Sequence, residues 1–258
     1  MTEFLSRSPL SFNTYADFVA LSRFQGEEDA EWKDKYADFV ESELMEFLTQ
    51  HGPGSLLLLP EECGELHLEA PDDLRFHMAD EMGDSIWFSF DIANRIGEDP
   101  MVLCEDALRR HLPDEDNLNP RVTTFAELES RAVDASDDIK VINKLGLLYS
   151  SMVADPAMHL TSLKQHPNYL LFRTAQRLAR SLNKGRNDLA PFTASGLEQP
   201  GDTGQALGDY LLVLAYIAKA RLNIPMQDIA QFNIAKLSHR KAHGKENDIH
   251  FDQTCVSA

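Results

Sequence analysis

Two stretches of the chain decide the fold: GDSIWFSFDIANRIGEDPM at 83–101 and GDYLLVLAYIAKARLNIPM at 208–226. Aligned at an offset of 125 residues without gaps, they share far more identities than the roughly one expected by chance. The matching pairs are Gly83/Gly208, Asp84/Asp209, Ile92/Ile217, Ala93/Ala218, Pro100/Pro225 and Met101/Met226. We infer a tandem duplication of a helical unit of about 110 residues.

The rest of the chain has the same helical character. Apolar residues recur at spacings of three and four in most segments, and we find no run of alternating β-branched residues bounded by turns. The pattern predicts an all-α chain of two tandem helical-bundle units packed as an intrachain pseudo-dimer. The units are 1–113 and 124–243, separated by PDEDNLNP at 113–120 and followed by a flexible tail at 244–258. Helices are predicted at 12–24, 27–50, 54–70, 73–96, 100–112, 123–134, 136–154, 168–184, 203–222 and 226–243.

Charge divides the chain in the same way. The 258 residues carry a net charge of −18, of which residues 1–129 (9 Lys+Arg, 30 Asp+Glu) contribute −21 and residues 130–258 (15 Lys+Arg, 12 Asp+Glu) contribute +3. An acidic balance argues against binding to duplex nucleic acid, which needs a basic patch. Either the acidic half is a solvated surface, or it gathers carboxylates for a cation while the other half offers positive charge to an anion.

Targeting and cysteine signals point to a cytoplasmic protein. No apolar run approaches the ~18 residues that span a bilayer, and the N-terminal residues show no basic region followed by an apolar stretch. Cys63, Cys104 and Cys255 lack CxxC spacing, so neither a disulfide framework nor a zinc knuckle is predicted.

Carboxylates cluster in EECGE at 61–65 and EMGD at 81–84. Glu62 and Glu65 share one helix face, as do Glu81 and Asp84, because residues three apart project to the same side. If the two helices pack antiparallel, the four acids converge, and their repulsion calls for a cation; oxygen ligands favour Mg²⁺, with Mn²⁺ as the alternative. A plain solvated helix face is the competing interpretation. No Glu-x-x-His occurs, which argues against a di-iron bundle.

The combined pattern, EECGE, fifteen residues and then EMGD, resembles the signature of the MazG-like nucleotide pyrophosphohydrolases of the all-α NTP pyrophosphatase superfamily. The likeness covers residues 40–112 well and 203–243 moderately. It implies that Glu62, Glu65, Glu81 and Asp84 hold Mg²⁺. It also implies that Glu61 and Glu62 are catalytic, with Glu61 placed to orient water; the alternative for Glu61 is an exposed helix residue.

A second feature of this family is an amide and cations on a later helix, here Asn233, Lys236 and Arg240 in FNIAKLSHR. Their spacing of three and four puts them on one helix stripe, which suits triphosphate oxygens as well as a solvated face. The second unit lacks the acids: at the same offset Ala206 stands opposite Glu81. It is therefore a degenerate repeat, and the sequence predicts one composite site per chain.

The implied activity is Mg-dependent hydrolysis of a (d)NTP to a (d)NMP and pyrophosphate, as in nucleotide-pool housekeeping. Two alternatives stay open: a non-enzymatic helical adaptor or oligomerisation protein that keeps the fold, and a pyrophosphatase for another pyrophosphate-linked nucleotide. The expected partner is the nucleoside triphosphate, with no nucleic acid and no membrane. The sequence leaves open the base, the choice between monomer and homodimer, and whether residues 185–204 form a lid.

Overall fold

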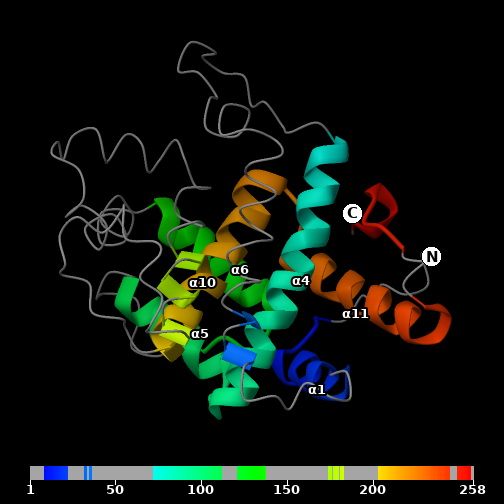
Figure 1. Cartoon of the computed structure of the whole chain (residues 1–258). Helices are drawn as coiled ribbons and strands as arrows, with labels where there is room; N and C mark the ends of the chain where they lie inside the picture. Colours follow the sequence, from blue (N-terminus) through cyan, green and yellow to red (C-terminus); the bar gives the residue numbers. More distant parts are fainter. Residues whose placement is uncertain are drawn as a thin grey trace, which may run out of the picture.

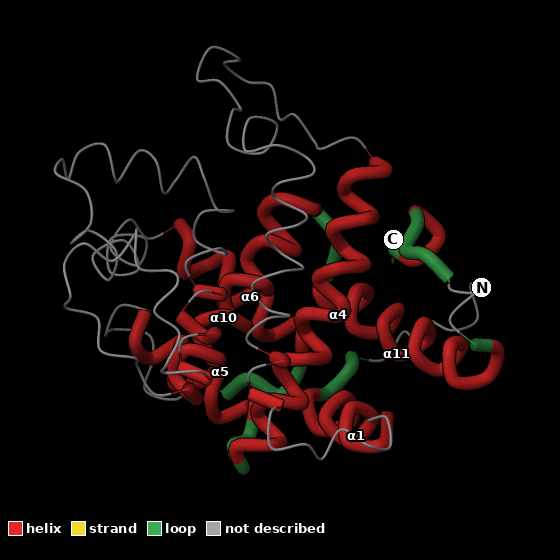
Figure 2. Tube along the Cα trace, viewed as in Figure 1, coloured by secondary structure: helices red, strands yellow, loops and turns green. Residues whose placement is uncertain are grey.

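The computed structural model describes residues 9–22, 32–33, 35–36, 72–111, 121–137, 174–175, 177–179, 181–182, 203–244 and 249–256. Within these ranges the regular elements are helices, and no strand is present (Figure 2). The elements are α1 (Phe12–Ser22), α4 (Asp72–Ile96), α5 (Pro100–His111), α6 (Phe125–Asp137), α10 (Thr203–Ile217), the π-helical turn η3 (Ala218–Leu222), α11 (Met226–His243) and the 3₁₀ turn η5 (Gln253–Cys255). The prediction of an all-α chain is confirmed for the described residues.

Several predicted helices are confirmed, with ends within three residues of the prediction. They are those at 12–24, 73–96, 100–112, 123–134, 203–222 and 226–243. The predicted helices at 27–50, 54–70, 136–154 and 168–184 lie wholly or largely outside the described residues, as do the boundary segment 113–120 and most of 185–204. None of the helices in the described ranges is long and apolar enough to cross a membrane.

The junction of α4 and α5 follows from its sequence. Gly97 ends α4 with a φ of 76°, a left-handed conformation that glycine adopts without steric cost, and the Glu98 N–H donates to the Ala93 carbonyl at 3.0 Å. Asp99 then caps α5, because its Oδ1 accepts from the Met101 N–H at 2.9 Å, and Pro100 takes the first helical position. The local sequence therefore ends α4 at Ile96 and begins α5 at Pro100.

Helix α10 is the central element, buried along nearly its whole length, as expected of a helix that is apolar on all sides. It packs against α5, α6 and α4, while α4 packs against α11 and α1 (Figure 1). Helices from both halves of the chain therefore contribute to one continuous hydrophobic core. The α4–α11 crossing joins two segments about 150 residues apart in sequence.

An isolated antiparallel bridge between Ser11 and Thr124 links the starts of α1 and α6. The Phe12 N–H donates to the Thr123 carbonyl at 2.9 Å, and the Phe125 N–H donates to the Leu10 carbonyl at 3.4 Å. The rings of Phe12 and Phe125 meet edge to face with centroids 4.8 Å apart. This contact joins the N-terminal end of α1, which packs on α4, to that of α6, which packs on α10.

The described part of the predicted tail lies against the helices. Phe251 is buried and packs on Phe232 of α11 and Phe76 of α4, with ring centroids 5.1 and 6.1 Å apart. Cys255, in the 3₁₀ turn that follows, is also buried. Residues 249–256 thus cover part of the α4–α11 crossing.

Candidate functional site

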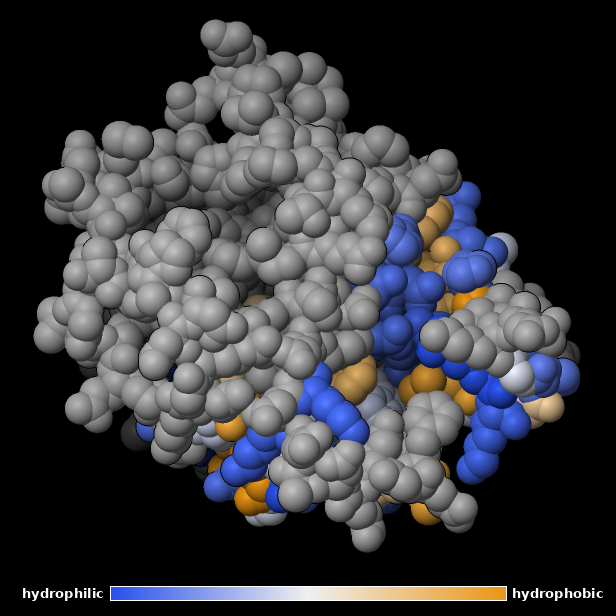
Figure 3. All heavy atoms as spheres, in the orientation of Figure 1, coloured by the Kyte–Doolittle hydropathy of each residue, from blue (hydrophilic) through white to orange (hydrophobic). Residues whose placement is uncertain are grey.

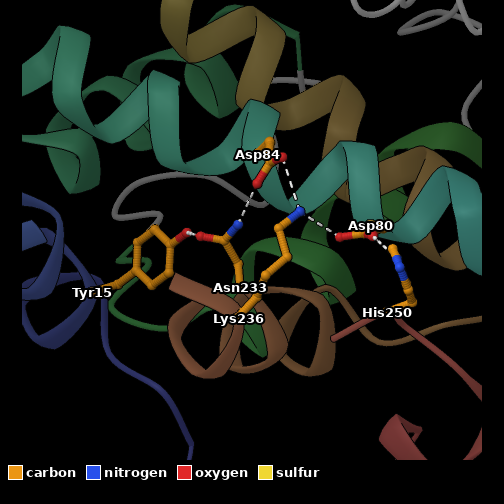
Figure 4. Close-up of polar contacts among 6 residues, drawn as sticks. All are labelled: Tyr15, Asp80, Asp84, Asn233, Lys236 and His250. Atoms are coloured by element: carbon orange, nitrogen blue, oxygen red, sulfur yellow. Dashed lines mark hydrogen bonds and ion pairs between the residues drawn. The ribbon is translucent and has the colours of Figure 1, made fainter. Parts of the chain in front are cut away.

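The candidate site lies where α4 crosses α11. Asp84 of α4 accepts two hydrogen bonds from α11: Asn233 Nδ2 donates to Oδ1 at 2.8 Å, and Lys236 Nζ donates to Oδ2 at 2.9 Å. Asp80, one turn earlier on α4, accepts from the same Lys236 Nζ at 2.5 Å through its Oδ1 (Figure 4). Three residues predicted for the site, Asp84, Asn233 and Lys236, are therefore brought together across the two halves of the chain.

Asn233 is held in one orientation by groups from two other helices. The Tyr15 hydroxyl of α1 donates to Asn233 Oδ1 at 3.0 Å, which turns the amide nitrogen toward Asp84. Gly83 lets α4 approach, since a Cβ at that position would lie 3.2 Å from Asn233 Cβ and 3.3 Å from its Nδ2. Gly83, which precedes Asp84, therefore leaves the space that the Asn233 amide occupies.

The environment keeps Lys236 charged although only 3% of the residue is exposed. Burial alone lowers the pKa of Lys236, but the negative charges of Asp84 and Asp80 and the hydrogen bonds to both outweigh it, and the pKa lies above its ordinary value. Burial, followed by the charge of Asp84, raises the pKa of the Tyr15 hydroxyl well above its ordinary value. Both groups are therefore protonated donors at neutral pH.

The other predicted residues are distributed as follows. Glu81 is partly buried on α4, three residues before Asp84, and Arg240 is partly buried on α11, one turn beyond Lys236. Glu61, Glu62 and Glu65 lie outside the described residues. Among the described residues no group of three or more His, Cys, Asp or Glu side chains could hold a metal ion. The described part thus supplies two of the four carboxylates predicted for Mg²⁺.

Sequence reasoning missed three residues of this cluster: Tyr15, Asp80 and His250. Asp80 stands one helical turn before Asp84, a spacing that places both on one face of α4 and that was visible in the sequence. His250 Nδ1 lies 3.6 Å from Asp80 Oδ2. No local signal pointed to Tyr15 or His250, because each reaches the site from an element far away in the sequence.

A second Gly-Asp pair, Gly208-Asp209, lies at the crossing of α10 and α5. Asp209, 2% exposed, accepts from Arg110 of α5 at 2.9 Å through Oδ1 and from Arg177 at 2.6 Å through Oδ2. Arg110 also donates to the Gln205 carbonyl at 3.2 Å. A Cβ on Gly208 would lie 2.4 Å from the Leu103 carbonyl oxygen, so glycine is required for this approach. The carboxylate here is neutralised by two guanidinium groups.

The described cysteines take no part in either cluster. Cys104 and Cys255 are free and buried. Burial, followed by the nearby charges of Asp99 and Glu105, raises the pKa of the Cys104 thiol. Because the thiolate is the nucleophile, Cys104 is unreactive at neutral pH.

Comparison of the chain with protein-family models, with curated proteins and with solved structures gave no match. The functional assignment therefore depends on the motif residues and on the geometry in which they meet.

Proposed function

We propose that this chain is a MazG-like, Mg-dependent nucleoside triphosphate pyrophosphohydrolase with one composite active site. The observation that carries the proposal is the meeting of Asp84, from the acidic half, with Asn233 and Lys236, from the basic half. Lys236 is buried and charged at a crossing where a merely solvated helix face would leave it in water. Burying an ammonium is costly unless it is paired, so its position reflects a demand for charge at this point.

The pseudo-dimer is part of the same proposal and has its own support. Packing is reciprocal between the halves: α4 of the first unit packs on α11 of the second, and α10 of the second packs on α5 of the first. The bridge between Ser11 and Thr124 is likewise reciprocal. A fused and diverged pair of this kind would keep one complete site and lose the other.

Mg²⁺ would be held by Glu62, Glu65, Glu81 and Asp84. Asp84 fits this role because each carboxylate oxygen that accepts one hydrogen bond keeps a further lone pair. Asp80 and Asp84 together carry one more negative charge than Lys236 balances, so the described cluster retains attraction for a cation. Bound there, Mg²⁺ would supply charge neutralisation to the phosphate oxygens.

The protein groups would then act on the substrate as follows. Lys236 and Arg240 stabilise the negative charge of the departing pyrophosphate, and Asn233, held by Tyr15, orients Asp84. Glu61 orients the attacking water, whose oxygen bonds to the α-phosphorus while the bond from that phosphorus to the bridging oxygen breaks. Pyrophosphate and a nucleoside monophosphate leave, and the proton of the water passes to a carboxylate.

A second candidate is the non-enzymatic helical adaptor, and one observation favours it. Lys236 already pairs with both Asp80 and Asp84, so part of the acidic cluster is satisfied without a metal ion. In an adaptor this buried ion pair would only fix the register of α11 on α4.

Pyrophosphate release from a panel of ordinary and modified ribo- and deoxynucleoside triphosphates with Mg²⁺ tests the proposal. Three variants accompany the wild type: Glu81→Gln, Lys236→Met and, as a matched control, the exposed Lys241→Met of α11. We expect release from the wild type and the control, and a loss of about 100-fold or more in the other two, as for removal of a group that stabilises transition-state charge. Circular dichroism checks that each variant is folded.

Mg²⁺ binding by calorimetry separates the alternatives. Glu81→Gln should weaken binding, whereas Lys236→Met should retain it; loss of binding in Lys236→Met would contradict the division of labour between the halves. Mg²⁺ binding without release from any triphosphate would point to another pyrophosphate-linked nucleotide. A folded protein that binds no Mg²⁺ would favour the adaptor.

A further inference from the structure

A pocket of about 270 Å³ opens beside the candidate site, between α4 and the C-terminal segment. Its walls are formed by Phe76, His77 and Asp80 from α4 and by His250, Phe251 and Asp252 from the C-terminal segment. Figure 3 shows that hydrophilic and hydrophobic residues alternate on the visible surface of the described residues. The pocket is smaller than the range of about 300–1,000 Å³ typical for drug-sized ligands, so it suits one small ring system.

Asp80 connects this pocket to the candidate site. Its Oδ1 accepts from Lys236, while its Oδ2 faces His250 at 3.6 Å (Figure 4). A ligand in the pocket would therefore lie one residue away from the ammonium group proposed to bind phosphate. The C-terminal segment, which the function proposed above does not use, provides half of the walls.

The chemistry of the walls favours a planar base over a phosphate. Two carboxylates, Asp80 and Asp252, would repel a phosphate but can accept hydrogen bonds from N–H groups. The side-chain hydrogen bond from Thr254, assisted by its backbone N–H, lowers the pKa of Asp252, which keeps this carboxylate ionised. The rings of Phe76 and Phe251, inclined by 36°, add an aromatic surface.

A metal ion is a poorer occupant. The pocket has four potential ligands, Asp80, Asp252, His77 and His250, but no three such groups in the described part of the chain lie close enough together to bind one. A lipid chain would not suit the carboxylates. An aromatic heterocycle with N–H donors on its edge matches the rings, the carboxylates and the volume at once.

We infer that this pocket binds a nucleobase carrying an exocyclic amino group, and that the base belongs to the nucleotide whose phosphates lie at Lys236 and Arg240. The inference rests on the proposed function. The C-terminal segment is then a specificity element: it supplies the imidazole, the ring and the carboxylate that distinguish one base from another.

Nucleosides, which lack phosphates, test the pocket independently of hydrolysis. Saturation-transfer NMR would measure the binding of adenosine, guanosine and cytidine against inosine and uridine, which have no amino group. We expect the amino-bearing nucleosides to bind about tenfold more tightly, because a base that displaces water from these carboxylates without offering an N–H donor costs them a hydrogen bond. Absence of binding, or equal binding of both groups, would overturn the inference.

Three substitutions locate the binding. His250→Ala affects a residue that is 82% exposed in its side chain and so does not disturb folding. Asp252→Asn keeps an acceptor for the Thr254 N–H, and Phe251→Leu keeps an apolar side chain in the buried position while removing the ring. Each should weaken nucleoside binding three- to tenfold, and Asp252→Asn should also reduce the preference for amino groups. Asp17→Asn and Phe18→Leu in α1 are the matched controls.

Steady-state kinetics with the triphosphates complete the test. The three substitutions should raise KM by the same factors and leave kcat within about twofold, because they touch the base and not the reacting phosphates. Turnover with unchanged KM and unchanged base preference would show that this pocket does not bind the base. It would still support the proposed hydrolysis. Nucleoside binding without pyrophosphate release would contradict the proposed hydrolysis and would support base binding in this pocket.

Discussion

Two helix crossings each contain a Gly-Asp pair, Gly83-Asp84 and Gly208-Asp209, and their paired side chains differ in net charge. At the α4–α11 crossing, two carboxylates, Asp80 and Asp84, share one ammonium, Lys236. At the α10–α5 crossing, one carboxylate, Asp209, is held by two guanidinium groups, Arg110 and Arg177. The first crossing has a net negative charge that a cation can balance, whereas the second has a net positive charge.

The charges at the two crossings can be compared with the division of charge along the sequence. The total of −21 in residues 1–129 and +3 in residues 130–258 could reflect surface composition alone. At the helix crossings the charges come from both halves: Lys236 of the basic half pairs with acids of the acidic half, and Arg110 of the acidic half pairs with Asp209 of the basic half. Of these two crossings, the one between α4 and α11 has more carboxylates than cations among its paired side chains.

The largest expected effect on stability comes from Lys236→Met, which leaves Asp80 and Asp84 without their cation. Breaking a buried ion pair by removing one partner costs about 3–5 kcal/mol, and we expect about 3 kcal/mol because both carboxylates keep some contact with water. Arg110→Met should cost about 1 kcal/mol, because Arg177 still pairs with Asp209. Urea unfolding at pH 7 measures both.

Repeating the unfolding measurements with Mg²⁺ provides the control for Lys236→Met and Arg110→Met. If the first crossing attracts cations, Mg²⁺ should restore part of the stability of Lys236→Met and none of that of Arg110→Met. Equal losses in the two variants, with no effect of Mg²⁺, would remove the electrostatic distinction between the crossings.

The substitutions Gly208→Ala and Gly83→Ala test how closely the helices approach each other at the two crossings. In Gly208→Ala the new methyl group would lie 2.4 Å from the Leu103 carbonyl oxygen, and the backbone must move, so we expect a loss of about 2–3 kcal/mol. In Gly83→Ala the new methyl group meets the side chain of Asn233 and not the backbone. The higher helix propensity of alanine offsets most of this strain, so we expect stability within about 1 kcal/mol of the wild type. The midpoints of urea unfolding should rank in this order; the reverse order would show that the α4–α11 contact is the tighter one.

Alkaline pH should weaken the α4–α11 crossing specifically. Because the charges of Asp84 and Asp80 outweigh burial and raise the pKa of Lys236, its stabilising contribution is fully present below the ordinary lysine value of 10.5 and is lost as the pH rises through the folded-state pKa. The difference in the free energy of unfolding between the wild type and Lys236→Met should stay constant up to about pH 10.5 and shrink above it. A difference that does not shrink above pH 10.5 would show that the fold does not raise the pKa of Lys236.

The smallest expected effect on stability concerns the capping groups at the N-terminal ends of α6 and α1. Glu127 Oε2 accepts from the backbone N–H groups of Thr123 and Thr124 at 2.7 and 3.1 Å, which lowers the pKa of Glu127. Glu127→Gln should cost under about 1 kcal/mol at pH 7. A lowered pKa means that this contribution is present above the ordinary value of 4.5 and is lost as the pH falls through the folded-state pKa.

Helix α1 serves as the reference, because its cap is a hydroxyl: the Thr14 N–H donates to Ser11 Oγ at 3.1 Å. Ser11→Ala should therefore lose about 1 kcal/mol independently of pH. Urea unfolding at pH 3.5, 5 and 7 would measure both variants. A cost of Glu127→Gln that persists at pH 3.5 would show that the carboxylate charge is not what stabilises α6.

The sequence alone was sufficient to predict the described helices and half of the cluster at the α4–α11 crossing. Helix positions follow from local spacing and from breaks such as Gly97 and Asp99-Pro100, where nearest neighbours in the chain decide the backbone. Asp84, Asn233 and Lys236 were singled out through the resemblance to the MazG-like pattern, and their spacing of three and four placed the residues of each helix on one face.

The tertiary structure alone decided which of these groups touch. Lys236 bonds to Asp80, 156 residues away, because α11 crosses α4 at the turn that carries both aspartates, and no local pattern encodes the register of that crossing. Tyr15 and His250 joined the cluster for the same reason, through the packing of α1 and the C-terminal segment. Local sequence fixes which side chains a helix offers, whereas the fit of apolar surfaces between distant helices determines which partners they meet.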